Sequence, residues 1–151
     1  MFDSELAAII AFTLASSENP QPFYWEINEG FTTPSVYFPP PEIDSSGDTF
    51  STYRLDYVWN LKFFADNTPE AMRMGKDTLI AIRAKRNKIP LIDESGEPTG
   101  RTIRINDPEV NKIGEGTVEL TLDWIERKPY DAEKAEKIAK YYLTMRLKGG
   151  N

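Results

Sequence analysis

Two segments in which apolar and polar side chains alternate constrain the fold of this chain most strongly. In residues 53–63 every second residue is large and apolar: Tyr53, Leu55, Tyr57, Trp59, Leu61 and Phe63. In residues 117–125 the apolar positions are Val118, Leu120, Leu122 and Trp124. Successive side chains of a β-strand point to opposite faces, so each segment predicts a strand with one buried and one mostly wet face. The chain must therefore cover two faces that each carry a tryptophan.

Three segments with helical spacing can supply that cover. The first begins after Asp3 or Ser4 and ends near Pro20, with Leu6, Ile9, Ile10, Thr13 and Leu14 on one face. In the second, Thr68 is predicted as the N-cap and Pro69 as the first helical residue, where a missing N–H costs nothing. The third follows Asp131 and carries Ala135, Ile138, Ala139, Tyr142 and Met145 on one face. These patterns predict three amphipathic helices.

The remaining segments are shorter. Residues 23–27, 35–38, 89–92 and 102–105 are predicted strands, and the last two are joined by a hairpin-type loop. Residues 39–52 consist largely of Pro, Ser, Asp, Gly and Thr, which predicts a long exposed loop of a kind that is usually functional or disordered. The expected fold is a single α+β domain over residues 1–151. Its antiparallel or mixed sheet is flanked by three helices in the order α-β-β-β-α-β-β-β-α.

Composition excludes many kinds of chemistry. A chain of 151 residues suits one domain. It has neither cysteine nor histidine, which excludes disulfides, thiolate nucleophiles and the commonest general base and metal ligand. The uncharged apolar stretch at residues 6–17 is shorter than the ~20 residues of a membrane span, and acidic residues precede it where a signal peptide has basic ones. We therefore expect a cytoplasmic product that does not enter a membrane.

Charge is unevenly distributed. Residues 1–72 hold two basic and eleven acidic residues, a net charge of −9, whereas residues 73–151 have a net charge of +3. A pI of about 4.8 argues against binding nucleic acid by neutralising phosphates. Lys85, Arg86 and Lys88 form a local basic run, whose usual meaning is a solvated helix end. The acidic half indicates either ordinary solubility or a surface that faces a partner.

No catalytic or metal-binding pattern emerges. The carboxylate pairs Asp93-Glu94 and Glu115-Glu119 lie in turns or on wet strand faces, where carboxylates are expected anyway. Asp44 and Asp48 resemble the start of a calcium loop, but Ser46 and Leu55 occupy positions where the motif needs other ligands. We therefore expect a protein that is not an enzyme and that has no catalytic residue, no cofactor and no metal site.

Residues expected at the surface indicate more about function than the search for catalytic groups does. Short strands bounded by prolines carry Phe23, Tyr24, Trp25, Tyr37 and Phe38, and a long polar loop follows them. Short edge strands beside such a loop are typical of subunits that contact neighbours in an assembly. An acidic half and a basic-leaning half also suit a head-to-tail contact, which closes into a ring when the rotation permits.

Between about residues 49 and 128 the sequence resembles the tail terminator proteins of tailed bacteriophages and phage-like particles. The resemblance rests on the strand end Leu61-Lys62-Phe63-Phe64-Ala65-Asp66, the helix start Thr68-Pro69-Glu70-Ala71, the hairpin over residues 89–105 and the strand at residues 116–124. The chain departs from the family at Gly114-Glu115-Gly116, where a sharper acidic-Gly turn is expected, and in a longer final helix.

The resemblance implies a virion protein assembled in the host cytoplasm. It implies a hexameric ring that caps the tail tube, stops its polymerisation and meets the neck or a head-completion protein. In a sheathed tail the ring also touches the last sheath ring. An acidic lumen would let DNA pass without specific binding. On this hypothesis Asp44 and Asp48 in the loop at 39–52 contact the lumen or a partner. The alternatives are another neck component, such as a head-tail joining protein, and a non-phage acidic binding or inhibitory module.

Overall fold

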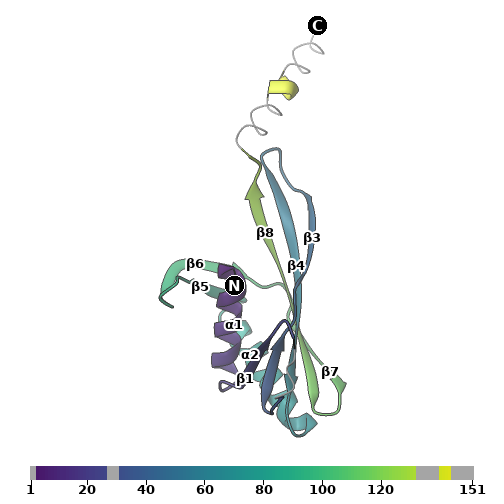
Figure 1. Ribbon diagram of the computed structural model, residues 1–151. Helices are drawn as coiled ribbons and strands as arrows, with labels where there is room; N and C mark the ends of the chain where they lie inside the picture. The colour runs from purple at the N-terminus through teal and green to yellow at the C-terminus, as the bar shows by residue number, and fades with distance from the viewer. Residues whose placement is uncertain (1–2, 27–30, 132–139, 144–151) are drawn as a thin grey trace. The chain divides into compact units, whose positions relative to one another are not determined.

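The computed structural model describes residues 3–26, 31–131 and 140–143 (Figure 1). Up to residue 131 the described chain forms two helices and eight strands. In chain order they are α1 Ser4–Ser16, β1 Gln21–Tyr24, β2 Ser35–Phe38, β3 Glu42–Gly47, β4 Thr52–Phe64, α2 Thr68–Ala84, β5 Lys88–Ile92, β6 Pro98–Arg104, β7 Glu109–Gly114 and β8 Thr117–Pro129.

The predicted α+β class is confirmed, and the described residues add two strands, β3 and β7, to those predicted. The third predicted helix lies largely outside the described residues, in which only residues 140–143 represent it, and these four are helical. No helix in the described ranges has both the length and the apolar character that crossing a membrane requires.

Six strands form one mixed sheet. Its hydrogen-bonded order is β1-β2-β4-β8-β7, and β3 pairs with β4 beside this path. β1 runs parallel to β2, whereas β2 is antiparallel to β4 and β7 is antiparallel to β8. The strands β5 and β6 form a separate antiparallel hairpin, in which Lys88 lies opposite Arg104 and Ile89 opposite Ile103.

The chain divides into two compact units. The first comprises Met1–Glu42 and Val58–Trp124, and the second comprises Ile43–Tyr57 and Ile125–Asn151. β4 and β8 each contribute residues to both units. That residues 1–151 behave as one domain stays a prediction.

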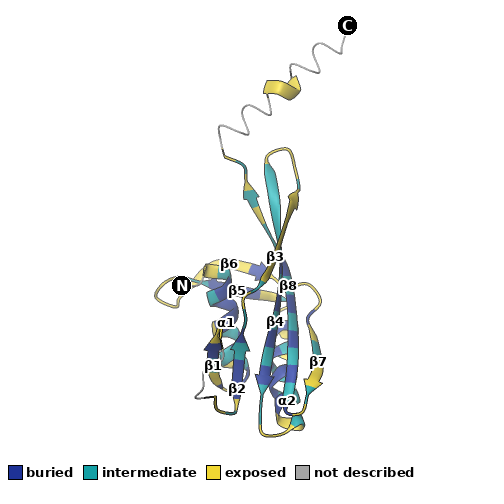
Figure 2. Cartoon of the chain, turned by 45° about the vertical axis from the view of Figure 1, so that its right-hand side comes forward, coloured by how far each residue is buried: buried dark blue, intermediate teal, exposed yellow. Residues whose placement is uncertain are grey.

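The first unit contains the core that the alternation predicts. Trp59, Leu61 and Phe63 of β4 are fully buried, and so are the apolar residues Val118, Leu120 and Leu122 of β8. The rings of Trp59 and Trp124 lie 6.2 Å apart between centroids. The intervening residues of both strands are only half-buried, so one face of this part of the sheet is covered and the other is wet (Figure 2).

Helix α2 approaches the sheet closely through Gly75. A Cβ atom at this position would lie 3.1 Å from Cγ1 of Val118 and 3.2 Å from Cγ1 of Val110. Both α1 and α2 lie on the same side of the sheet, and β5 packs against α1 (Figures 1 and 2). The helices therefore provide the cover that the two tryptophan-bearing faces require.

The observed N-cap residue agrees with the prediction in α1 and differs from it in α2. Asp3 caps α1 as predicted, because its carboxylate accepts a hydrogen bond of 3.0 Å from the backbone N–H of Leu6. The predicted cap of α2 was wrong by one residue. Asn67, not Thr68, caps this helix, accepting a 2.9 Å hydrogen bond from the N–H of Glu70. Asn is at least as good a cap as Thr, and the Thr68 hydroxyl instead accepts a hydrogen bond from Gly116 N–H.

The segment at residues 39–52 is exposed, as predicted, but it is not one structureless loop. β3 occupies Glu42–Gly47 within it, and every residue of β3 is exposed. Pairing with β4 satisfies backbone groups along one edge of this strand without burying any side chain, which is why a pattern of apolar residues gives no sign of it.

Candidate interaction surface

The described part of the second unit is a ribbon of three strand segments with almost no core. We define the ribbon as residues 43–57 and 125–131. In it β3 pairs with β4, and β4 pairs with β8. Among these residues only Tyr57 is buried, at 6% exposure. Small sheets need a covered apolar face for stability of their own, and the described ribbon lacks one.

Apolar side chains of the second unit are instead exposed to solvent. Ile43 on β3 is 53% exposed, and Phe50 in the turn after β3 is 48% exposed. Tyr141, Tyr142 and Leu143 are more than half exposed, although the Tyr142 ring contacts that of Phe50 at 5.7 Å. Large apolar side chains that are exposed on an ordered segment are typical of a surface that contacts a partner.

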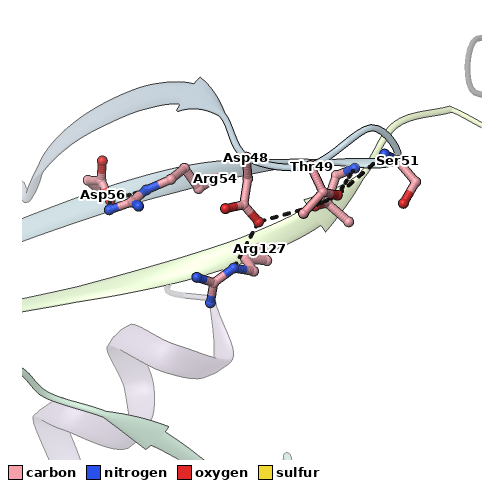
Figure 3. A network of polar contacts seen from close by, with 7 residues as sticks. Asp48, Thr49, Ser51, Arg54, Asp56 and Arg127 are labelled. Carbon is pink, nitrogen blue, oxygen red and sulfur yellow. Dashed lines mark hydrogen bonds and ion pairs between the residues drawn. The ribbon is translucent and has the colours of Figure 1, made fainter. Parts of the chain in front are cut away.

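Polar contacts, rather than a core, hold the turn between β3 and β4 (Figure 3). Oδ2 of Asp48 accepts hydrogen bonds from Nε of Arg127, at 2.8 Å, and from the hydroxyl of Thr52, at 3.2 Å. The Thr49 hydroxyl accepts a hydrogen bond of 3.0 Å from the N–H of Thr52. The side chain of Asp48 is only 15% exposed in this arrangement. The turn is therefore ordered by specific bonds to β4 and β8.

A second set of contacts joins β4 to β8 within the ribbon. The Tyr57 hydroxyl donates to Oε2 of Glu126 at 3.0 Å, and Glu126 forms an ion pair with Lys128 at 3.0 Å. The N–H of Tyr130 donates to the carbonyl of Ser51 at 3.0 Å, and the Tyr53 and Tyr130 rings lie 5.5 Å apart. These bonds fix the strand register of the ribbon, and Ile43 and Phe50 stay about half exposed beside them.

The two predicted contact residues lie in different environments. Asp44 is exposed on β3, and its side chain forms no hydrogen bond or ion pair with any described residue. Asp48 is engaged by Arg127 and Thr52, so it has a structural role in the turn. Whether either residue contacts a lumen or a partner stays a prediction.

Sequence reasoning missed Arg127, Ile43 and Phe50. The pairing of Arg127 with Asp48 depends on contacts across 79 positions of sequence, which no local pattern reveals. Ile43 and Phe50 were visible as isolated large apolar residues in an otherwise polar segment. Such residues are the available signal, because nothing within their own segment can bury them.

The two carboxylate pairs weighed in the sequence are engaged in turns and ion pairs. Hydrogen bonds from the Ser95 hydroxyl and from the backbone N–H groups of Glu97, Ser95 and Gly96 lower the pKa of Asp93. The Lys112 ammonium, followed by the Thr68 hydroxyl, lowers the pKa of Glu115. A carboxylic acid that donates a proton near neutral pH needs a raised pKa. Asp93 and Glu115 are shifted in the opposite direction.

Fold and surface together define a small α+β protein with one well-packed unit and one ribbon in which Ile43 and Phe50 are about half exposed among the described residues. No family model matches the sequence. Over 128 residues the chain is 35% identical to the phage-like element PBSX protein XkdJ of Bacillus subtilis (strain 168), covering 85% of this chain and 87% of that protein. Over 113 residues it is 36% identical to the uncharacterized protein YqbJ of the same strain, covering 75% and 77% respectively.

The chain therefore belongs to the family of XkdJ and YqbJ, one member of which is a protein of a phage-like element. Among solved structures, it is similar to a chain from the virion of a native gene transfer agent particle. That similarity has a TM-score of 0.46 at 12% identity and covers 82% of this chain and 93% of the other.

Proposed function

We propose that this protein is a structural virion protein and, specifically, the tail terminator subunit of a phage or phage-tail-like particle. Six copies form a ring that caps the tail tube and stops its polymerisation. The opposite side of the ring meets the neck, and in a sheathed tail the ring also contacts the sheath.

Membership of the XkdJ family supports the phage context of the proposal. The match extends over 87% of XkdJ, so it covers most of a protein that is itself named as part of a phage-like element. The resemblance of residues 49–128 to tail terminators adds the specific place in the tail. The strand, helix and hairpin on which it rests correspond to β4, α2 and the β5–β6 pair.

The observation that carries the assembly role is the ribbon. Its turn is held by Asp48 and Arg127, and its strands are in register, yet Ile43 and Phe50 are about half exposed. Burying apolar surface contributes about 25 cal/mol per Å², and an ordered surface loses little entropy when it docks. A preorganised ribbon of this kind suits a contact with a neighbouring subunit or with the tube.

The net charge of −6 suits a channel through which DNA moves. Like charges do not trap phosphates, so the ring lets DNA pass without specific binding. The proposal assigns no reaction, cofactor or metal to the protein.

The experiment combines the purified protein with the tail tube protein of its own particle. Light scattering gives the mass of the protein alone and in the mixture, and electron microscopy gives the length of the tubes. We expect a ring of about six subunits, or a monomer that binds tube ends and shortens the tubes. A monomer that leaves tube length unchanged would contradict the proposal, and binding to a neck protein alone would favour a head-tail joining role.

A matched pair of variants tests the ribbon itself. Ile43→Asn and Ile80→Asn each replace an isoleucine that is about half exposed, 53% for Ile43 and 51% for Ile80, but only Ile43 lies in the ribbon. Ile43→Asn is expected to weaken capping, and by at least about tenfold when combined with Phe50→Asn, whereas Ile80→Asn leaves it unchanged. Equal behaviour of both variants would show that the ribbon does not carry the contact.

A further inference from the structure

The corner where α2 passes into β5 carries a dense, uncompensated positive charge. We define the basic corner as Lys85, Arg86, Lys88 and Arg104, all of which are exposed. Lys88 and Arg104 lie directly opposite each other in the β5–β6 pairing. Like charges at directly opposed positions destabilise a strand pair, so this arrangement has a cost within the free subunit.

Within the described residues no ion pair offsets that charge. Across residues 3–26, 31–131 and 140–143, none of the four basic-corner side chains forms an ion pair. Nearby basic residues behave differently. Arg73 contacts Glu18, Glu70 and Asp77, and Arg83 pairs with Asp107 at 3.5 Å. The basic corner is therefore free to bind an anionic surface.

The backbone of the basic corner is held in place. The N–H of Asn87 donates to the carbonyl of Ile82 at 2.9 Å, and the N–H of Ile105 donates to the carbonyl of Asn87 at 2.7 Å. Because these bonds tie the corner to the end of α2, its charges are positioned before any partner arrives.

The other end of the same hairpin has the opposite charge. The loop at residues 93–97 carries Asp93, Glu94 and Glu97 and no basic residue. Asp93 Oδ1 accepts hydrogen bonds from the N–H groups of Ser95, at 2.9 Å, and Glu97, at 3.0 Å, which order the loop. None of the three carboxylates forms an ion pair within the part of the chain that the structure describes. The hairpin is thus basic at its base and acidic at its tip.

We propose that the β5–β6 hairpin makes the head-to-tail contact between copies of this chain, with the acidic tip of one copy against the basic corner of the next. The inference rests on the proposed ring function and names the surfaces that join the subunits. A ring needs two different, complementary surfaces on each subunit, and the two ends of one hairpin provide them. Complementary charge sets the partner and register of such a contact.

Charge exchange tests this pairing directly. The first variant combines Lys85→Glu, Lys88→Glu and Arg104→Glu, which leaves one positive and three negative groups and so makes the corner acidic. The second combines Glu94→Lys with Glu97→Lys and so makes the tip basic. Each variant alone is expected to lose self-association and tube capping at least about tenfold, because both ends of its hairpin then carry the same charge.

Two combinations should restore assembly. In an equimolar mixture of the two variants, every contact between unlike copies joins opposite charges, so alternating rings with an even number of subunits can close. A single chain that carries all five substitutions should also assemble, because the charges of both ends are reversed together. We expect each combination to reach within about threefold of the wild-type association. Lys76→Glu, which reverses an exposed charge of α2 that lacks an ion pair in the described residues, should leave assembly unchanged.

Several outcomes would overturn the inference. Wild-type association in either charge-reversed variant would do so, as would failure of both combinations when circular dichroism shows folded protein.

A 20-base-pair DNA duplex tests whether nucleic-acid phosphates, rather than the acidic tip of another copy, bind the basic corner. If the duplex binds the wild type, and the variant with Lys85→Glu, Lys88→Glu and Arg104→Glu loses this binding without any loss of assembly, the corner would be assigned to phosphates instead. If the wild type caps tubes and the charge-reversed variants assemble as the wild type does, only the hairpin contact is refuted. A wild type that neither associates nor caps tubes would refute the proposed function as well.

Discussion

Gly116 shows how a single residue can join three elements. Its φ is +65°, and a Cβ atom there would lie 2.6 Å from the carbonyl oxygen of Ala65. The Gly116 carbonyl accepts a hydrogen bond from Ala65 N–H at 2.9 Å, and its own N–H donates to the Thr68 hydroxyl at 3.0 Å. The turn between β7 and β8 is thereby tied to the end of β4 and the start of α2.

Position 116 requires glycine for two reasons, its positive φ and the close backbone contact, and substitutions at three glycines separate them. Gly116→Ala is expected to lower the free energy of unfolding by about 2–4 kcal/mol, since it combines a positive φ with a backbone clash. Gly96→Ala has a φ of +87° but open space, so it should cost only about 1 kcal/mol. Gly47→Ala has neither constraint and is the control. Urea unfolding measures all three, and equal losses for Gly116→Ala and Gly96→Ala would contradict the clash.

Asp93 supplies a prediction about pH. The Ser95 hydroxyl is the largest of the causes that hold its pKa below the ordinary value of 3.8. Ser95→Ala should therefore raise the pKa of Asp93 toward 3.8 in an NMR titration, and Ser46→Ala should leave it unchanged. A lowered pKa stabilises the folded state above the ordinary value, and this contribution is lost as the pH falls through the folded-state pKa. A pKa of Asp93 that is the same in Ser95→Ala and in the wild type would refute the assignment.

Local residue patterns predicted some of these features and not others. The burial of Trp59 and Trp124 followed from alternation alone, because strand geometry fixes which side chains share a face. The sequence could not show that Asn67 rather than Thr68 caps α2, because both residue types suit the N-cap position. The ion pair of Asp48 with Arg127 was out of reach, since it depends on how β4 and β8 are placed side by side.

Among the elements, the strands and helices that bury side chains were predictable and the others were not. β4, β8 and α2 carry clear periodicity, whereas β3 and β7 bury no residue fully and are built by backbone pairing. β3 was interpreted as part of a loop for this reason. The same property marks β3 as functionally interesting, because a strand that adds nothing to a core still holds the ribbon in order.

The turn after β3 allows a measurement of what the polar network contributes. Asp48→Ala should lower the free energy of unfolding by about 1 kcal/mol, because it removes the Arg127 ion pair and the Thr52 hydrogen bond. Asp44→Ala, on the same hairpin but exposed and unpaired within the described residues, should change it by less than about 0.3 kcal/mol. A double-mutant cycle of Asp48→Ala with Arg127→Ala isolates the pair. A coupling energy of zero would show that Arg127 does not hold the turn.

For the molecule as a whole, the contrast between the two units has a consequence for stability. The first unit buries two tryptophans and most of the apolar side chains, while the described ribbon buries only Tyr57. Local stability follows the density of buried contacts, so backbone hydrogen bonds in β3 should open far more readily than those around Trp59 and Trp124.

Hydrogen exchange followed by mass spectrometry tests this picture across the chain. In the free protein, peptides from residues 43–51 are expected to exchange at least about a hundredfold faster than peptides from residues 59–63 and 118–124, because residues 43–51 bury no side chain whereas the core segments bury their large apolar ones. Adding tail tube protein should slow exchange at residues 43–51 and leave the core peptides as they were. The double variant with Ile43→Asn and Phe50→Asn should lose that protection, while Ile80→Asn keeps it. Capped tubes on which residues 43–51 still exchange freely would show that the exposed apolar side chains of the ribbon serve a contact other than the tube.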